Sequence, residues 1–443
     1  MRLINTSNLD FEEFKLTDAP PYAILSHTWV GAETSYQDVL NDRKAGRKTQ
    51  YTKLIEGCRA AEKHGFKHFW IDTCCIDKTN HVELSEAINS MFKWYRQAGI
   101  CLAYLADVSP TTTAAIDLEP EFAKSKWFER GWTLQELIAP LEVESLASDW
   151  SKLTSKTELC STLALITGIP SEFLLGKQLG EASVAMRMSW ASNRITTKAE
   201  DIAYCLMGIF DLHMPLLYGK GEGRAFRRLQ QEIINELDDH SIFAWTANDA
   251  QWPPHASADL RTVSVLAWSP ECFRQSNLVV EAEPPFLDRY VAGIRAPTAF
   301  NNKGLHMALP IISKGNRRVV TVLDCGPHGK EDEERFAIWL RDVSVNGGRY
   351  VRVDHQKLET LKLAEIMSLP SRAKYSYITI TRGKDEDFTN LPGDVPVPEV
   401  EGIPGQLNIS NVWLKRGKST RKGKKSKKRA SPNFVACPLP ESC

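Results

Sequence analysis

The chain has 443 residues, 42% of them apolar and 25% charged, an ordinary balance for a soluble globular protein of two or three domains. Its formal net charge is zero, but ten of the fifteen residues from Lys415 to Arg429 are Lys or Arg, so the remainder carries ten more acidic than basic side chains. This balance excludes specific nucleic-acid binding by the folded body. No apolar run has the length of a membrane span, and the N-terminal residues lack a signal-peptide core.

The first 150 residues alternate between strand-like and helix-like segments, which predicts a parallel α/β sheet with flanking helices. Short apolar runs predict strands, and apolar residues three or four apart predict helices that end near Gly65 and Gly99. The expected strands are 22–29, 68–76, 100–108 and 141–150, and the expected helices are 51–64 and 82–97.

Residues 151–248 have helical periodicity, with helices expected at 159–166, 182–190, 199–210 and 224–237. Thr196 or Thr197 is the expected cap of the third of these helices. From 249 to 410, short apolar runs separated by Gly, Pro, Asn and Asp predict a mostly β module. The basic tail, 411–443, is predicted to be disordered. It would serve as a solvated tail, a nuclear-import signal or an arm that binds polyanions or anionic lipid.

The ten cysteines are scattered and mostly lie in apolar runs, as in the sequence AYCLMGIF. This pattern predicts buried, reduced thiols rather than a disulfide framework, and with it a cytoplasmic protein. Cys74 or Cys75 with His27 and Asp77 would be the components of a thiol hydrolase. Cys74, Cys75, His27 and His81 would be those of a zinc site. We expect neither, because the pair lies in an apolar run and adjacent residues of a strand point to opposite faces.

Three motifs carry the clearest functional signal: YAILSHTW at 22–29, HFWIDTCCIDK at 68–78 and SKWFERGWTLQELIAP at 125–140. In this order they resemble the fungal heterokaryon-incompatibility (HET) domain. The segment at 189–230 resembles the helical region that commonly follows it, so the resemblance covers roughly the first 245 residues. It implies an effector of vegetative incompatibility that triggers cell death after non-self recognition, with protein partners and a possible homo-oligomer.

In an open parallel sheet, ligands bind beyond the carboxyl ends of the strands, where the strand order reverses. Ser26 ends the first expected strand, Asp72 ends the second, and Glu136 lies on the helix after the third. The three motifs are therefore expected to meet at one edge of the sheet. We predict a cleft there that includes Arg130 and Trp132.

The HET domain is thought to be related to the Toll/interleukin-1-receptor (TIR) domain, which implies a TIR-like or flavodoxin-like sheet. Enzymatic TIR domains cleave NAD with one Glu, in some of them within a Trp-x-x-x-Glu arrangement that matches Trp132 and Glu136. The resemblance implies that Glu136 is catalytic and that NAD is a substrate; no cofactor or metal is expected. Trp132 would then stack on a ring, Arg130 would bind the pyrophosphate, and Ser26 and Asp72 would orient ribose hydroxyls.

Other interpretations of these residues remain open. The tryptophans would cover the core, and Asp72 would cap a turn. Glu136 would be an acidic side chain on the solvent side of its helix, without a catalytic role. The domain would then be a non-enzymatic assembly module or an inactive paralogue. Val30 favours the last alternative, because the family usually has Gly directly after the first-motif Trp, whereas here Gly31 comes one residue later.

Overall fold

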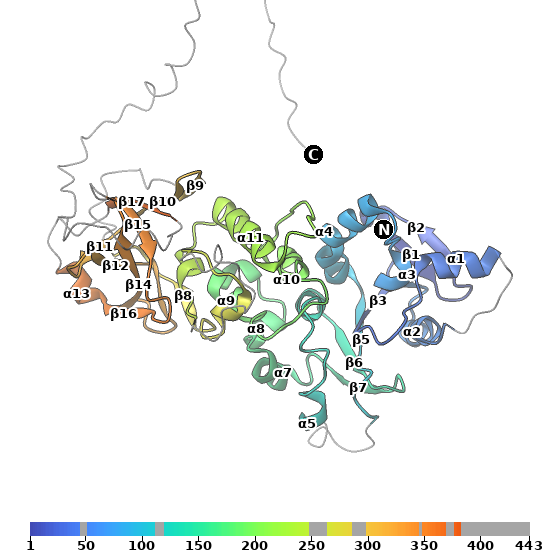
Figure 1. Cartoon of the computed structure of the whole chain (residues 1–443). Helices are drawn as coiled ribbons and strands as arrows, with labels where there is room; N and C mark the ends of the chain where they lie inside the picture. Colours follow the sequence, from blue (N-terminus) through green and yellow to red (C-terminus); the bar gives the residue numbers. More distant parts are fainter. Residues whose placement is uncertain are drawn as a thin grey trace, which may run out of the picture. The chain divides into compact units, whose positions relative to one another are not determined.

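The computed structural model describes residues 1–44, 51–110, 119–247, 264–285, 298–344, 348–368 and 376–381. Met1–Glu399 forms one compact unit. The predicted basic tail, 411–443, lies outside the described residues, and the domain boundaries expected from the sequence stay predictions. Figure 1 shows the described elements with their labels.

A seven-stranded mixed sheet forms the N-terminal region (Figure 1). Its strands lie in the order β2-β1-β4-β3-β5-β6-β7, and the central four are parallel. Across the sheet the four parallel strands lie in the order β4-β3-β5-β6, so the first of them in the chain, β3, is flanked by the second and the third. The direction in which the chain adds strands therefore reverses between β3 and β5. The strands are β1 (Arg2–Asn5), β2 (Phe11–Glu13), β3 (Ala23–His27), β4 (His68–Trp70), β5 (Ile100–Tyr104), β6 (Val143–Leu146) and β7 (Lys152–Ser155).

The expected parallel sheet is present at the centre, and antiparallel strands extend it at both edges. β1 pairs antiparallel with β4, β2 with β1, and β7 with β6. These edge strands have three or four residues, too few for the apolar alternation that marks a strand in a sequence. The second expected strand is also shorter: His68–Trp70 is extended, and Asp72–Cys75 forms the helix α3. Cys74 and Cys75 therefore do not alternate across a strand.

Helices pack around this sheet. The helix α4 begins at Asn80, whose side chain accepts hydrogen bonds from the backbone N–H groups of Val82 and Glu83. Its buried stripe is close to the predicted one and includes Ile88 and Met91. The helices are α1 (Tyr36–Lys44), α2 (Thr52–Lys63), α3 (Asp72–Cys75), α4 (His81–Gln97), α5 (Glu119–Phe122) and α6 (Thr133–Ile138).

Short helices follow the sheet. The helix expected over 199–210 is in fact split between α10 (Asp201–Tyr204) and η4 (Met207–Phe210). Thr196 and Thr197 do not cap it: Glu200 holds the cap position, and the Thr196 hydroxyl donates to the Lys198 carbonyl. The other helices are α7 (Cys160–Thr167), α8 (Ser171–Leu174), η3 (Leu179–Glu181), α9 (Val184–Ser189), α11 (Glu222–Glu236) and η5 (His240–Phe243).

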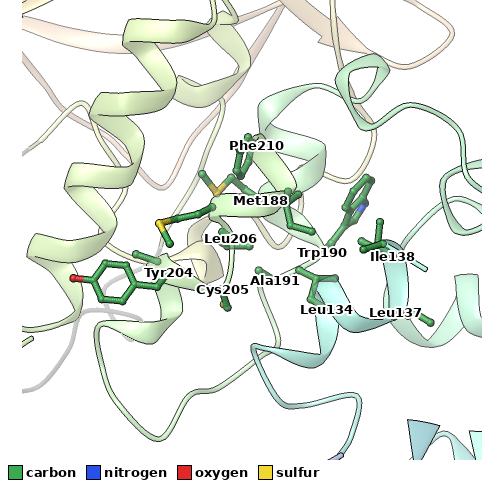
Figure 2. Packing of buried hydrophobic residues seen from close by; sticks show 14 of the residues in the cluster. Leu134, Leu137, Ile138, Met188, Trp190, Ala191, Tyr204, Cys205, Leu206 and Phe210 are labelled. Atoms are coloured by element: carbon green, nitrogen blue, oxygen red, sulfur yellow. The ribbon is translucent and has the colours of Figure 1, made fainter. Parts of the chain in front are cut away.

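The helix α6 is one of the elements of the sheet region that contact these later helices. Figure 2 shows Leu134 and Ile138 of α6 near buried side chains of the segment 188–210, in the same core cluster as Leu137. Burying a side chain of this size stabilises the fold by about 2 kcal/mol. The position of α6 therefore depends on both regions. The partners shown in Figure 2 are Met188, Trp190, Ala191, Tyr204, Cys205, Leu206 and Phe210.

The later part of the chain is rich in β structure, as expected. Its main sheet has eight strands in the order β11-β12-β14-β15-β17-β10-β9, with β16 also paired to β14. All its pairings are antiparallel except that of β15 with β17. The strands are β9 (Ala299–Asn301), β10 (Gly304–Leu309), β11 (Ile311–Ser313), β12 (Arg318–Val322), β14 (Glu334–Asp342), β15 (Arg349–Arg352), β16 (Glu359–Lys362) and β17 (Ser376–Ile380).

Smaller elements complete this region: the paired strands β8 (Val279–Glu281) and β13 (Cys325–Pro327), and the helices η7 (Pro270–Phe273) and α13 (Leu363–Met367). One of the short apolar runs expected to form strands, VSVLAW at 263–268, is irregular from Ser264 onward, where backbone groups bond to side chains. The Val265 carbonyl accepts from Trp245, and the Ala267 amide donates to Gln230. The expected strand at 289–294 lies outside the described residues.

The eight cysteines of the described residues are free and buried, as predicted. Cys437 and Cys443 lie outside that part of the chain. Among the described helices, none combines the length and the apolar character that a bilayer crossing needs.

Candidate functional site

A pocket of about 590 Å³ lies beyond the carboxyl ends of β3 and β4 and is closed on one side by the segment 195–218. It occupies the region where the order of the parallel strands reverses, as ligand sites of open α/β sheets do. Four of the five predicted site residues line it: Asp72, Arg130, Trp132 and Glu136. The volume is typical of a pocket for a small molecule.

Glu136 lies at the base of the pocket and is only 7% exposed. Burial raises its pKa to about 7, although a hydrogen bond from Ser26 and the nearby charge of Arg130 oppose this. The Ser26 hydroxyl donates to Glu136 Oε2 at 2.5 Å. Near neutral pH this carboxyl group is therefore close to half ionised, the condition in which a carboxyl can exchange a proton or stabilise a cation.

Ser26 lies behind Glu136 rather than in the pocket. Its side chain is fully buried, and its hydroxyl accepts from Trp127 Nε1 at 2.8 Å while it donates to Glu136. The resulting chain of hydrogen bonds fixes one carboxylate oxygen of Glu136 against β3. The predicted contact of Ser26 with ribose hydroxyls does not fit this geometry, which makes Ser26 a positioning residue.

The helix α6 is itself fixed by buried cations. Lys156 Nζ donates to the carbonyls of Leu137, at 3.3 Å, and of Pro140 at the C-terminal end of the helix. Burial lowers the pKa of Lys156 to about 8. At the other end, Arg194 donates to the carbonyl of Arg130 and to the Thr133 hydroxyl, both at 2.9 Å. These contacts hold both ends of the helix that carries Glu136.

Asp72 has the opposite electrostatic environment. Burial alone would raise the pKa of Asp72, but Lys78 and His27 together hold it well below its usual range. Lys78 Nζ lies 3.2 Å from Oδ2, and His27 Nε2 lies 2.9 Å from Oδ1. Asp72 is therefore a fixed carboxylate in the pocket wall, able to accept hydrogen bonds from a ligand.

Two cations lie against the ring of Trp29, which lines the pocket and is 45% exposed. Lys78 Nζ is 4.0 Å from the ring centroid and Arg130 Cζ is 4.9 Å from it. Arg130 Nε is buried and, within the described part of the chain, has no hydrogen-bond partner. A donor left in this state is suited to an anionic ligand group.

Trp132 is held by the later helices. Its Nε1 donates to Asp201 Oδ2 at 3.1 Å, and the Tyr218 hydroxyl donates to Oδ1 of the same carboxylate at 2.9 Å. Burial raises the pKa of Asp201 despite these two bonds. Lys198 Nζ lies 4.3 Å from the centre of the Tyr218 ring. The helical region thus supplies an aromatic wall to the pocket.

The chain at Ile195 pairs directly with the third motif. The Ile195 amide donates to the Glu129 carbonyl at 2.7 Å, and the Gly131 amide donates to the Ile195 carbonyl at 2.8 Å. A Cβ atom on Gly131 would lie 2.5 Å from Thr196 Cγ2, so a larger residue here would displace the Thr196 side chain. The motif that carries Arg130 and Trp132 is therefore complete only when the segment around Ile195 is paired with it.

Sequence reasoning missed several residues of this pocket as ligand-facing groups: Trp29, Lys78, Lys198, Asp201 and Tyr218. Trp29 and Lys78 lie within the first two motifs, and the other three lie in the segment that resembles the HET-associated region. The motifs were thus the available signal that these residues belong to the site. Their contacts across the pocket could not be derived from spacing.

The shifted glycine of the first motif does not approach the pocket. Gly31 has a φ of +71°, and a Cβ atom placed on it would meet nothing within 4 Å. The Val30 amide donates to Glu33 Oε1 at 3.0 Å, and neither Val30 nor Gly31 lines the pocket. The glycine thus serves the backbone turn and lies away from the pocket wall.

Cys74 is unsuited to nucleophilic chemistry, as predicted. Burial raises the pKa of its thiol to about 12. Among the described residues, no group of three or more His, Cys, Asp and Glu side chains has the arrangement of a metal site.

The comparison with known families agrees with the first two motifs. Residues 22–118 match the family described as Heterokaryon incompatibility protein (HET), and residues 224–303 match a domain of unknown function, DUF8212. The N-terminal region of this chain is therefore similar to fungal HET domains.

A curated relative is the Vegetative incompatibility protein HET-E-1 of Podospora anserina, to which the chain is 50% identical over 220 residues. The match covers 48% of this chain and 16% of that protein, so the chain corresponds to a small part of its relative. No solved structure matches.

Proposed function

We propose that this protein acts in vegetative incompatibility, as the name of its relative states for that protein, and that it triggers cell death after non-self recognition. The pocket beyond β3 is the reaction site, and NAD is its substrate. The order of the parallel strands, which is also that of flavodoxin-like sheets, supports a TIR-like relationship.

One observation carries the proposal: a carboxyl group with a pKa of about 7, Glu136, lies in a pocket that Arg130 also lines, and among the described residues Arg130 Nε has no hydrogen-bond partner. A perturbed carboxyl, an anion-binding donor and aromatic walls in one pocket are the components expected of an enzyme that acts on a nucleotide.

The proposed reaction breaks the bond between the nicotinamide nitrogen and the ribose carbon. Nicotinamide leaves with the bonding electron pair, and the ribose passes through an oxocarbenium-like state that ionised Glu136 stabilises. Water then adds to the same carbon, and its proton passes to Glu136 and on to solvent. Arg130 binds the pyrophosphate, Asp72 accepts from ribose hydroxyls, and Trp29 or Trp132 stacks on a ring.

The direct test is the release of nicotinamide from NAD by the purified protein. Glu136→Gln keeps the size of the side chain and its acceptor for Ser26, so the fold should persist, and turnover should fall about a thousandfold. Glu86→Gln is the matched control, because Glu86 is an exposed carboxylate on α4 that does not line the pocket. Its turnover should equal that of the unaltered protein.

Two results would reject the enzymatic proposal: no release by folded protein at high concentration, or full release by Glu136→Gln. A domain that triggers cell death by assembly would then be the better account. Toxicity would in that case survive Glu136→Gln in cells and follow the oligomeric state of the protein.

A further inference from the structure

A row of charged side chains runs behind the pocket wall that carries Asp72. Glu33 Oε1 lies 2.5 Å from Lys53 Nζ, and Lys53 Nζ lies 3.0 Å from His27 Nδ1. The other ring nitrogen of His27, Nε2, lies 2.9 Å from Asp72 Oδ1. Nothing in the proposed reaction uses Glu33 or Lys53, although both are largely buried, with 13% and 21% of their side chains exposed.

The order of donors along this row is fixed by chemistry. The Lys53 ammonium group has only donors, so His27 Nδ1 must accept from it. His27 then carries its proton on Nε2 and donates it to Asp72. The imidazole, whose side chain is 2% exposed, is thereby held in one tautomer from both sides.

The consequence for the pocket lies at Asp72. Its Oδ1 is occupied by His27, and its Oδ2 is next to Lys78 Nζ at 3.2 Å, on the side where Lys78 also contacts Trp29. The orientation of the carboxylate is thus set from behind, and Oδ2 is left with lone-pair capacity for a ligand hydroxyl.

We propose that Lys53, held by Glu33, is a positioning residue of the pocket: it fixes the tautomer of His27 and so aims Asp72 at the hydroxyl groups of a ribose-containing ligand. This inference rests on the proposed function for the identity of the ligand. The tautomer itself does not depend on any activity.

The variant Lys53→Met removes the donor to His27 Nδ1 and keeps much of the side-chain volume. Lys53→Arg keeps a donor for both Glu33 and His27 and serves as the rescue variant. Lys63→Met is the matched control, because Lys63 is an exposed lysine of the same helix, α2.

Nitrogen NMR of the imidazole gives the first measurement. The unaltered protein, Lys53→Arg and Lys63→Met should each show His27 with its proton on Nε2 alone, and Lys53→Met should lose that single state. The same Nε2 tautomer in folded Lys53→Met, or the Nδ1 tautomer in the unaltered protein, would overturn the proposal whether or not NAD is cleaved. Should Lys53→Met not fold, the tautomers of the unaltered protein and of Lys53→Arg decide.

Kinetics with NAD give the second measurement. Asp72 contacts a part of the ligand remote from the broken bond, so its misorientation should weaken substrate and transition state alike. Lys53→Met should raise KM about fivefold and leave kcat within about twofold. An unchanged KM would overturn the link from Lys53 to the ligand. No turnover by the unaltered protein would refute the proposed function, and the NMR result would still decide the tautomer.

Discussion

The two walls of the pocket shift the pKa of a carboxyl group in opposite directions. On the wall formed by α6, Glu136 is buried, and its pKa is raised to about 7. On the wall behind β4, Asp72 is flanked by Lys78 and His27, which hold its pKa well below the usual range. One carboxyl group can therefore change its charge near neutrality while the other keeps it. Such a separation is how a single site assigns two roles to two carboxylates.

The strongest test of this contrast is the pH dependence of NAD cleavage. If ionised Glu136 is the active form, the rate should rise with pH and level off above about 7. Because the rate falls tenfold per unit below that pKa, we expect about a hundredfold difference between pH 5 and pH 8. A rate that falls over the same range would assign Glu136 the role of an acid.

Stability should show the same contrast without any substrate. The pKa of Glu136 in the folded protein lies above its unfolded value of 4.5. The contribution of this side chain to the free energy of unfolding is therefore fully present below pH 4.5 and is lost as pH rises through about 7. Glu136→Gln avoids this loss and should raise the free energy of unfolding at pH 8 by up to about 3 kcal/mol. Denaturant titrations at pH 5 and pH 8 measure the effect, which should be small at pH 5. An equal effect at both pH values would contradict the raised pKa.

Asp72→Asn should act in the opposite direction. The pKa of Asp72 in the folded protein lies below its unfolded value of 3.8. The contribution of this side chain to the free energy of unfolding is therefore present above pH 3.8 and is lost as pH falls through the folded pKa. At pH 7 the variant leaves Lys78 and His27 without their anion and should lower the free energy of unfolding by about 2 kcal/mol. Thermal unfolding beside Asp18→Asn, an exposed control, measures the loss. A variant as stable as the control would show that these contacts are not stabilising.

The smallest expected effect is that of Ser26→Ala. Its hydroxyl donates to Glu136 and lowers the pKa of that carboxyl, so its removal should raise the pKa further. The midpoint of the pH–rate profile should move upward by about one pH unit. Ser161→Ala, at an exposed position of α7, should leave the midpoint unchanged. A downward shift with Ser26→Ala would mean that Ser26 does not stabilise the ionised form.

The sequence predicted the central strands and the edge of the sheet where the pocket lies, because buried parallel strands are continuous apolar runs. It also predicted Asp72, Arg130, Trp132 and Glu136 as neighbours, because each follows a strand or lies in one motif. These predictions depended only on local pattern and on the geometry that parallel strands share.

Other features could not be predicted, because they arise from contacts between distant segments. Lys53 lies on a helix between two motifs, and only the fold brings its ammonium group to His27. Asp201 similarly reaches Trp132 across 69 positions of the chain. The strands β1 and β2 are too short to show a period. Ser26 was predicted as a site residue, but its burial behind Glu136 depends on how α6 packs.

The packing of α6 also limits how this domain can be exchanged between proteins. The HET match ends at residue 118, before the helix that carries Glu136, and the apolar side of that helix is covered by residues from 188 to 210. A transplanted fragment that stops at residue 150 would uncover Leu134 and Ile138 and would lose the backbone pairing at Ile195. The folding unit is therefore longer than the segment that matches the HET family, and recombination within it would separate the candidate pocket from the segment that forms one of its walls.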